Sequence, residues 1–171
     1  QSEYAAWKAD TNLSAAERLT MTARALHEDL TLMNVSSWDY FAAVARGADA
    51  LIVVNDNRPE YYALTRHFWA IGNYSKFIKG YTRVEVEGAG LPEGVMGSAY
   101  LAPDGKELVF VAVNDTAADK TVALAGLPAG SRGEVYETSM QRTCETARGI
   151  MLADNGYVLP AESVTTFVFQ L

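Results

Sequence analysis

The sequence predicts an α/β portion followed by an all-β portion: the terminal β/α units of a (β/α)8 barrel over residues 1–80, then an antiparallel β-sandwich over residues 81–171. Two observations lead to this prediction. Apolar residues recur with a helical period before Gly80 and alternate like those of strands after it. One or two β/α units cannot close a parallel sheet, so we expect the other barrel strands to precede Gln1 in a longer parent protein.

The first helix is predicted to begin at a capping box formed by Ser14 and Glu17 and to end at Asn34. Its apolar face is expected to carry Leu19, Ala23, Leu26, Leu30 and Met33. Residues 35–45 end in a nearly continuous apolar run, which is typical of a parallel strand covered on both faces. This helix and strand would form one piece of a β/α repeat.

A second helix is predicted after the short apolar stretch 51–54. Pro59 is expected in its first turn, where the missing N–H has no partner in any case, and Gly80 is expected as the left-handed residue just past its end. The buried stripe of this helix is expected to contain Leu64, Phe68, Ile71, Phe77 and Ile78.

The second half contains seven short segments with strand-like alternation. They cover residues 82–87, 97–102, 107–113, 120–127, 133–138, 149–152 and 163–171. Turn-forming residues separate several of them, at 103–106 and 154–156. This number of short strands favours an antiparallel sandwich, and the lack of a Gly/Ser linker predicts that the two halves pack together.

Composition and charge exclude several classes of protein. The chain has 171 residues, of which 49% are hydrophobic and 20% charged, as in globular proteins. Its net charge of −7 disfavours nucleic acid as a partner, and no apolar run is long enough to span a membrane. With one cysteine and two histidines, neither an intrachain disulfide nor a Cys/His zinc site can form. We expect no metal and no cofactor.

Active sites of β/α barrels form at the carboxyl ends of their strands. We therefore select candidate site residues near the ends of the two predicted barrel strands. Glu3 and Tyr4 come first, and Trp38 and Tyr40 lie in the next strand. The indole of Trp38 either stacks on a sugar ring or fills the core, and these roles are compatible. His27 and His67 are interpreted as packed or surface residues, and Cys144 as a thiol without a role.

These segments together resemble the C-terminal part of family 30 glycoside hydrolases. The resemblance rests on residues 1–4 (Gln-Ser-Glu-Tyr), on 26–30 and 34–38 in the first helix and next strand, and above all on 69–81 with its Gly-Asn-Tyr-Ser run. It continues through the sandwich to the Ser-Val-Thr-Thr run at 163–166. The tryptophan and proline that the family carries beside two of these motifs are absent. Residues 72–75 look most like the β-1,6-galactanase/glucanase-like branch.

The resemblance implies a retaining hydrolase of β-linked polysaccharide, such as β-1,6-galactan, that is secreted, periplasmic or at the cell surface. It implies that Glu3 is the catalytic nucleophile and that Tyr4, Trp38 and Tyr40 bind the polysaccharide or oligosaccharide substrate. The acid/base of the family belongs to the missing N-terminal barrel portion of the parent protein. The chain alone is therefore expected to be inactive, because the retaining mechanism needs both carboxyl groups.

Two other interpretations remain open. The chain is alternatively a non-catalytic carbohydrate-binding or structural β-sandwich module, or a swapped oligomer that completes its sheet with strands of a neighbour. Calorimetry with β-1,6-galactan, β-1,6-glucan and xylan separates the hydrolase portion from the binding module, because a binding module binds without the barrel. The mass in solution tests the swapped oligomer.

Overall fold

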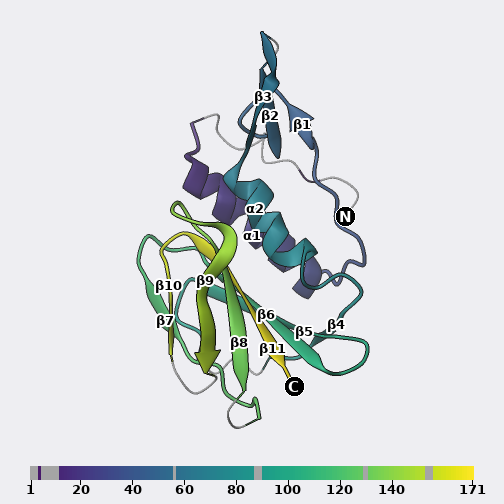
Figure 1. Cartoon of the computed structure of the whole chain (residues 1–171), viewed down its shortest axis with the longest axis vertical. Helices are drawn as coiled ribbons and strands as arrows, with labels where there is room; N and C mark the ends of the chain where they lie inside the picture. The colour runs from purple at the N-terminus through teal and green to yellow at the C-terminus, as the bar shows by residue number, and fades with distance from the viewer. Residues whose placement is uncertain (1–3, 5–11, 56, 87–89, 129–130, 153–155) are drawn as a thin grey trace.

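The structure is a computed structural model that describes residues 4, 12–55, 57–86, 90–128, 131–152 and 156–171. It contains a six-stranded sheet with the order β4-β5-β6-β11-β8-β9, a two-stranded sheet β10-β7 and a three-stranded sheet β1-β2-β3. Two helices lie on one face of the six-stranded sheet, and the β2–β3 hairpin projects away from it (Figure 1). The arrangement is mostly β and sandwich-like, as the sequence predicts for its second half.

The helices and strands have the following bounds. The helices are α1 (Ala15–Thr31) and α2 (Arg66–Ser75). The strands of the N-terminal part are β1 (Val44–Ala45), β2 (Ile52–Asn55) and β3 (Arg58–Leu64). The other strands are β4 (Thr82–Val84), β5 (Val95–Leu101), β6 (Glu107–Asn114), β7 (Lys120–Val122), β8 (Arg132–Thr138), β9 (Thr143–Leu152), β10 (Tyr157–Leu159) and β11 (Ser163–Gln170).

Helix α1 begins as predicted, at a reciprocal capping box. The Ser14 hydroxyl accepts a hydrogen bond from the Glu17 amide at 3.2 Å, and the Glu17 carboxylate accepts one from the Ser14 amide at 2.7 Å. The helix ends at Thr31, and Asn34 then adopts a left-handed conformation with φ 51°. The apolar face is buried at Leu19, Ala23 and Leu26, whereas Met33 lies beyond the helix and is exposed.

The predicted buried strand over residues 35–45 is wrong. Val44–Ala45 forms β1, which pairs in parallel with β2, and Tyr40 makes an isolated parallel bridge with Tyr4. Phe41 and Val44 are each 55% exposed. A strand is covered on both faces only where a layer packs on each of them. Among the described residues, α1 contributes such a layer on one face alone, through contacts with Tyr4 and Trp38.

The predicted position of Pro59 in a helix is also wrong, because this proline lies in β3, which pairs antiparallel with β2. Proline is tolerated on an edge strand, and the tyrosines that follow favour extended structure. Helix α2 starts only after Thr65, whose hydroxyl accepts from the Phe68 amide. Gly80 adopts the expected left-handed conformation, with φ 80°.

The buried face of α2 also differs from the predicted stripe. Phe68 and Ile71 are only half-buried, and the buried residues are His67, Ala70, Asn73 and Tyr74. Polar residues therefore share the buried side of this helix. Asn73 finds its partners in the sheet, and His67 contacts the Thr65 hydroxyl.

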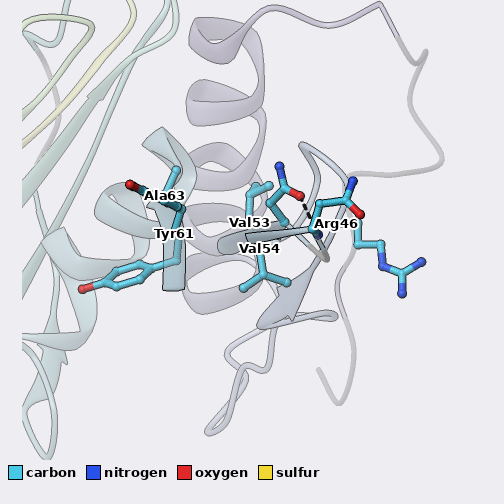
Figure 2. A pocket seen from close by; sticks show the side chains of 8 residues that line it. Arg46, Val53, Val54, Tyr61 and Ala63 are labelled. Carbon is cyan, nitrogen blue, oxygen red and sulfur yellow. Dashed lines mark hydrogen bonds between the residues drawn. The ribbon is translucent and has the colours of Figure 1, made fainter. Parts of the chain in front are cut away.

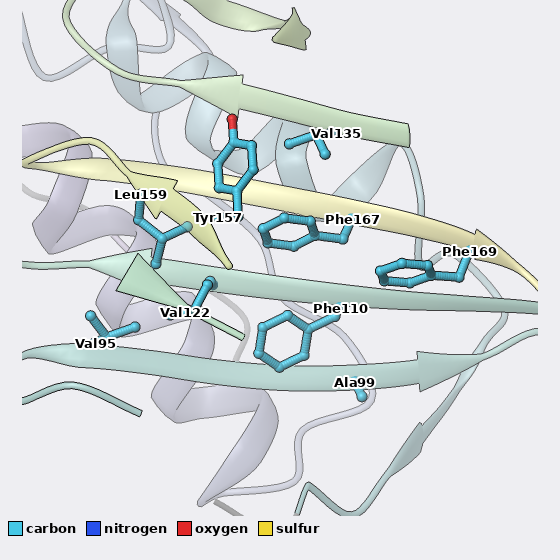
Figure 3. Close-up of a cluster of buried hydrophobic side chains, with 10 residues drawn as sticks. Val95, Ala99, Phe110, Val122, Val135, Tyr157, Leu159, Phe167 and Phe169 are labelled. Carbon is cyan, nitrogen blue, oxygen red and sulfur yellow. The ribbon is translucent and has the colours of Figure 1, made fainter. Parts of the chain in front are cut away.

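The six-stranded sheet is covered on both faces, and its central strands β6 and β11 are therefore buried along most of their length. One face packs on the helices, through a cluster that joins Leu19, Ala23, Leu26, Ala70 and Tyr74 to Tyr100, Val109, Val111, Val113 and Val164. The opposite face packs on β7 and β10, through Phe110, Phe167, Phe169, Val122 and Leu159 among others (Figure 3). The helices therefore share a core with the sandwich and are not tethered beside it.

Asn73 joins α2 to the middle of the sheet through hydrogen bonds. Its side-chain amide donates to the Tyr136 carbonyl of β8 at 3.1 Å and to the Thr166 hydroxyl of β11 at 2.9 Å. Its side-chain oxygen accepts from the Thr138 hydroxyl, and Thr166 donates to the Asn73 carbonyl at 2.7 Å. A fully buried amide is stable only when its donors and acceptor are satisfied, and these contacts satisfy them.

Candidate functional site

Tyr4 lies beside Tyr40 because the two segments pair as parallel strands do. The Tyr4 amide donates to the Asp39 carbonyl at 2.9 Å, and the Phe41 amide donates to the Tyr4 carbonyl at 2.7 Å. Parallel pairing of this kind is the arrangement of adjacent strands in a β/α protein. Glu3, the predicted nucleophile, lies outside the described residues.

The structure brings together the three aromatic residues that the sequence singles out. The ring centroids of Tyr4 and Trp38 are 5.2 Å apart, those of Tyr4 and Tyr40 5.9 Å, and those of Trp38 and Tyr40 6.2 Å. These separations are typical of packed aromatic pairs. We call Tyr4, Trp38 and Tyr40 the aromatic cluster.

The polar ends of the aromatic cluster are directed toward α1 and the loop before β2. The Trp38 indole N–H donates to the Asp29 carboxylate of α1 at 2.8 Å, and the Tyr4 hydroxyl donates to the Met21 carbonyl of α1 at 3.4 Å. The Tyr40 hydroxyl donates to the Asp49 carbonyl at 2.7 Å. The rings therefore fill the space between the paired segments and α1, and each remains half-buried.

His67 extends the cluster from the first turn of α2. Its ring centroid lies 5.5 Å from that of Tyr40, and its Nε2 is 3.1 Å from the Thr65 hydroxyl. Burial lowers the pKa of His67, although hydrogen bonds to the backbone at Ala50 and Asp49 act in the opposite direction. The imidazole is thus neutral at pH 7 and joins α2 to the loop that holds Tyr40.

A charged pair holds the same loop against α1. The Arg18 guanidinium donates to the Asp49 carboxylate at 2.8 Å and also to the Leu13 carbonyl. The Arg18 side chain is only 8% exposed, so this pair is shielded from solvent more than a surface ion pair is. This pair holds in place the loop whose Asp49 carbonyl accepts a hydrogen bond from the Tyr40 hydroxyl.

Side chains alternate along an extended segment, and this alternation divides the site into two faces. Trp38 and Tyr40 occupy the face toward α1, whereas Asp39 and Phe41, which alternate with them, are exposed. The Asp39 carboxylate accepts a hydrogen bond from the Ser37 hydroxyl at 3.3 Å. The face opposite the aromatic cluster is therefore accessible to a ligand.

Tyr4 is unsuited to act as a base. Burial raises the pKa of its hydroxyl, and the negative charge of Asp29 raises it further. A phenol with a pKa above its usual value stays protonated at neutral pH. Its hydroxyl acts as a hydrogen-bond donor to α1.

The sequence did not identify a second group of aromatic residues, which lies on the β2–β3 hairpin. Tyr61 and Tyr62 are 61% and 69% exposed, and they line a pocket of about 500 Å³ together with Arg46, Asn55 and neighbouring residues of the hairpin (Figure 2). The signal was present in the sequence as two adjacent tyrosines. The predicted helix start at residues 55–59 places these tyrosines in a helix, whereas they lie in β3.

The remaining candidates have structural surroundings. His27 is buried in α1, and burial lowers its pKa. Burial also raises the pKa of the Cys144 thiol, so it stays protonated at neutral pH. Across the described part of the chain, no three His, Cys, Asp or Glu side chains gather as a metal site would require. The helices described there are too short or too polar to cross a membrane.

Comparison with known proteins gives matches among solved structures only. No protein-family model and no curated protein matches the chain. A conserved exported protein from Bacteroides fragilis shares 28% identity with a TM-score of 0.85, over 98% of this chain and 38% of that protein. The catalytic domain of a family 30 xylanase C from Talaromyces cellulolyticus shares 22% identity with a TM-score of 0.76, over 99% of this chain and 40% of the other.

An endo-β-1,6-glucanase is also similar, with 18% identity and a TM-score of 0.61, over 99% of this chain and 35% of the other. The chain thus spans between 35% and 40% of the length of these solved structures. Because three xylanases and an endo-β-1,6-glucanase are similar in structure over at least 99% of this chain, the chain has a glycoside hydrolase family 30-like fold.

Proposed function

We propose that the chain is the C-terminal portion of a retaining glycoside hydrolase that acts on β-linked polysaccharide, with β-1,6-galactan or a similar polymer as the substrate. In this proposal, residues 1–80 complete a (β/α)8 barrel and residues 81–171 form its β-sandwich domain. The observation that carries it is the parallel pairing of Tyr4 with Tyr40 beneath α1, within a family 30-like fold.

Glu3 is the proposed nucleophile. Tyr4 faces α1, and the strand alternation seen at Trp38 and Tyr40 predicts that a neighbour of Tyr4 in sequence belongs to the opposite, accessible face. A carboxylate on that face would attack the anomeric carbon, and a second carboxylic acid about 5 to 5.5 Å away would protonate the leaving oxygen. That acid would then activate the water that releases the glycosyl-enzyme intermediate.

The aromatic cluster has a positioning role in this proposal. The hydrogen bonds of Tyr4, Trp38 and Tyr40 to α1 and to the Asp49 carbonyl hold the ends of two adjacent strands at a fixed separation. The rings pack toward α1 and away from the accessible face, so the contribution of these residues to substrate binding would come through the strand ends that they hold. This role requires that the strand ends stay in register.

The proposed partner of the chain is the N-terminal barrel portion of its parent protein. Val44 exposes a large apolar side chain on β1, the outer strand of its sheet. Exposed apolar side chains beside an edge strand are what a further barrel strand would cover. The exported nature of the Bacteroides fragilis protein supports a secreted, periplasmic or cell-surface location.

Reconstitution tests this proposal. The chain is combined with the upstream portion encoded in its parent gene, and the release of reducing sugar from β-1,6-galactan, β-1,6-glucan and xylan is measured. We expect hydrolysis from the combination and none from the chain alone. Glu3→Gln should lower kcat by at least about 1000-fold, as expected for a residue essential to the chemistry, while Glu93→Gln, at an exposed loop glutamate, should leave kcat unchanged.

Covalent trapping gives the second readout. A 2-deoxy-2-fluoro glycoside with a good leaving group should label a peptide at residue 3, detected by mass spectrometry. Reconstituted activity that survives Glu3→Gln would remove Glu3 from the mechanism. Hydrolysis by the isolated chain would show that the catalytic pair does not depend on an upstream portion.

A further inference from the structure

We infer that the β2–β3 hairpin carries a saccharide-binding subsite, formed around Tyr61 and Tyr62, that takes part of a β-linked oligosaccharide. The inference rests on the proposed function for the class of ligand, but it places binding on residues that the catalytic proposal does not use. It also predicts that the isolated chain binds saccharide weakly through the hairpin, whereas a carbohydrate-binding β-sandwich module would bind through residues 81–171.

The backbone of the hairpin explains how two adjacent tyrosines line one pocket. Val54 pairs with Tyr62, whereas the next residue of β2, Asn55, pairs with Arg58, so the register shifts by several residues at this point. Residues 59–61 of β3 are left without a paired residue on β2. Such irregularities redirect side chains that strict alternation would send to opposite faces, and here both tyrosines border the pocket.

The groups around the pocket have the chemistry that recognises a pyranose ring. Tyr61 and Tyr62 present aromatic rings, which stack on the apolar C–H face of a sugar. Asn55 and Asn57 supply side-chain amides for its hydroxyl groups. The side-chain oxygen of Asn55 accepts a hydrogen bond from the backbone amide of Asn57 at 2.9 Å, which fixes this part of the turn. The side-chain NH2 group of Asn55 carries two further donors.

The two tyrosines differ in how much ring is open to a ligand. The Arg58 guanidinium lies over the Tyr61 ring, with Cζ 5.7 Å from the centroid, so one face of that ring is partly covered. Tyr62 is the more exposed of the two. A volume of about 500 Å³ is within the range of small-molecule sites.

The hairpin is continuous with the candidate site. β1 follows Tyr40 closely in the chain, and Val44 and Ala45 of β1 pair with Ile52 and Val53 of β2. The sheet that begins near the Tyr4–Tyr40 bridge therefore leads directly to the tyrosines. A polymer bound at the strand ends can continue along this sheet, which is why an oligosaccharide is a better occupant than a single sugar.

A nuclear magnetic resonance titration of the 171-residue chain tests the inference. The 15N-labelled chain is titrated with xylohexaose, a β-1,6-gluco-oligosaccharide and a β-1,6-galacto-oligosaccharide, with maltohexaose as the α-linked control. We expect at least one β-linked probe to shift backbone resonances within residues 53–63, with a Kd on the order of 1 mM. Maltohexaose should bind at least about tenfold more weakly.

Substitutions locate the binding. Tyr61→Ala and Tyr62→Ala should each weaken binding about tenfold, as loss of an aromatic anchor does, while Tyr61→Phe and Tyr62→Phe keep the rings and should stay within about threefold. Val158→Ala, at an exposed strand position of the sandwich, should have no effect. The spectrum of each variant also reports directly whether it is folded.

Several results would overturn the inference. These are the absence of hairpin shifts with every β-linked probe, shifts confined to the sandwich, and unchanged affinity in both alanine variants. Burial of the tyrosines against the upstream polypeptide, detected as loss of their solvent accessibility on reconstitution, would identify a protein partner instead. None of these outcomes touches the role of Glu3, which the hydrolysis assay measures separately.

Discussion

Replacing Asn73 with alanine should strongly destabilise the chain. The side chain makes three buried hydrogen bonds, to the Tyr136 carbonyl, the Thr166 hydroxyl and the Thr138 hydroxyl. At about 1 kcal/mol each, their loss amounts to about 3 kcal/mol in the free energy of unfolding. Ser75→Ala, at an exposed position of the same helix, should change it by less than about 0.5 kcal/mol.

The assay is urea unfolding followed by far-ultraviolet circular dichroism, with thermal unfolding as a second measurement. For a chain of this size, a loss of about 3 kcal/mol corresponds to a decrease in Tm of about 6 to 12 °C. If Asn73→Ala stays within about 1 kcal/mol of Ser75→Ala, the network does not hold α2 on the sheet. A fall in the m-value would instead indicate a change in compactness or a loss of two-state behaviour.

Three further predictions concern stability. Burial lowers the pKa of His27 and of His67 below 6.5, so the unfolded chain binds protons more readily and the free energy of unfolding should fall as pH decreases from about 6.5 toward the lowered folded values. Urea unfolding at a series of pH values should show a slope of up to about 1.4 kcal/mol per pH unit for each histidine, and the double glutamine variant should flatten it. Ser14→Ala removes the cap of α1 and should cost about 1 kcal/mol, measurable as a small decrease in Tm; an unchanged Tm would mean that the capping box is dispensable. A Cβ at Gly133 would lie 2.5 Å from a core phenylalanine ring, so Gly133→Ala should lose about 1 to 3 kcal/mol in urea unfolding, whereas Gly47→Ala, where nothing lies within 4 Å, should not.

The parts of the fold that the sequence predicted are those governed by local patterns. The capping box at Ser14 and Glu17 involves neighbours in sequence, and it is present in the structure. The strand-length apolar segments of the second half, separated by turn residues, predicted most strands of the sandwich, because both features are local in the sequence. Strand β10 (Tyr157–Leu159) was missed, since three residues carry too little periodicity to detect.

The errors arose where local patterns allow two structures. An apolar run such as 40–45 is compatible with a strand buried on both faces, but burial depends on which layers are present, and Phe41 and Val44 are exposed. Proline is tolerated both in a first helical turn and on an edge strand, so Pro59 is compatible with either structure. The choice was made by the pairing of β3 with β2, which are joined by a short turn.

The sequence singles out Tyr4, Trp38 and Tyr40 as candidate site residues, and the orientation of their rings comes from the structure. Adjacent barrel strands were expected to bring Tyr4, Trp38 and Tyr40 together, and the ring distances of 5.2 to 6.2 Å agree with that. The direction of the rings toward α1, and the participation of His67 from α2, depend on contacts between elements far apart in sequence. The roles of Glu3 and of the three aromatic residues in catalysis and substrate binding stay predictions.

By itself, the sequence determined where helix α1 begins and where most strands of the sandwich run. Only the tertiary structure decided which faces are covered, that a hairpin precedes α2, and that Tyr61 and Tyr62 border a pocket. The physical reason is the range of the interactions. Caps and periodicity act within a few residues, whereas burial and strand register are set by segments that fold together from distant parts of the chain.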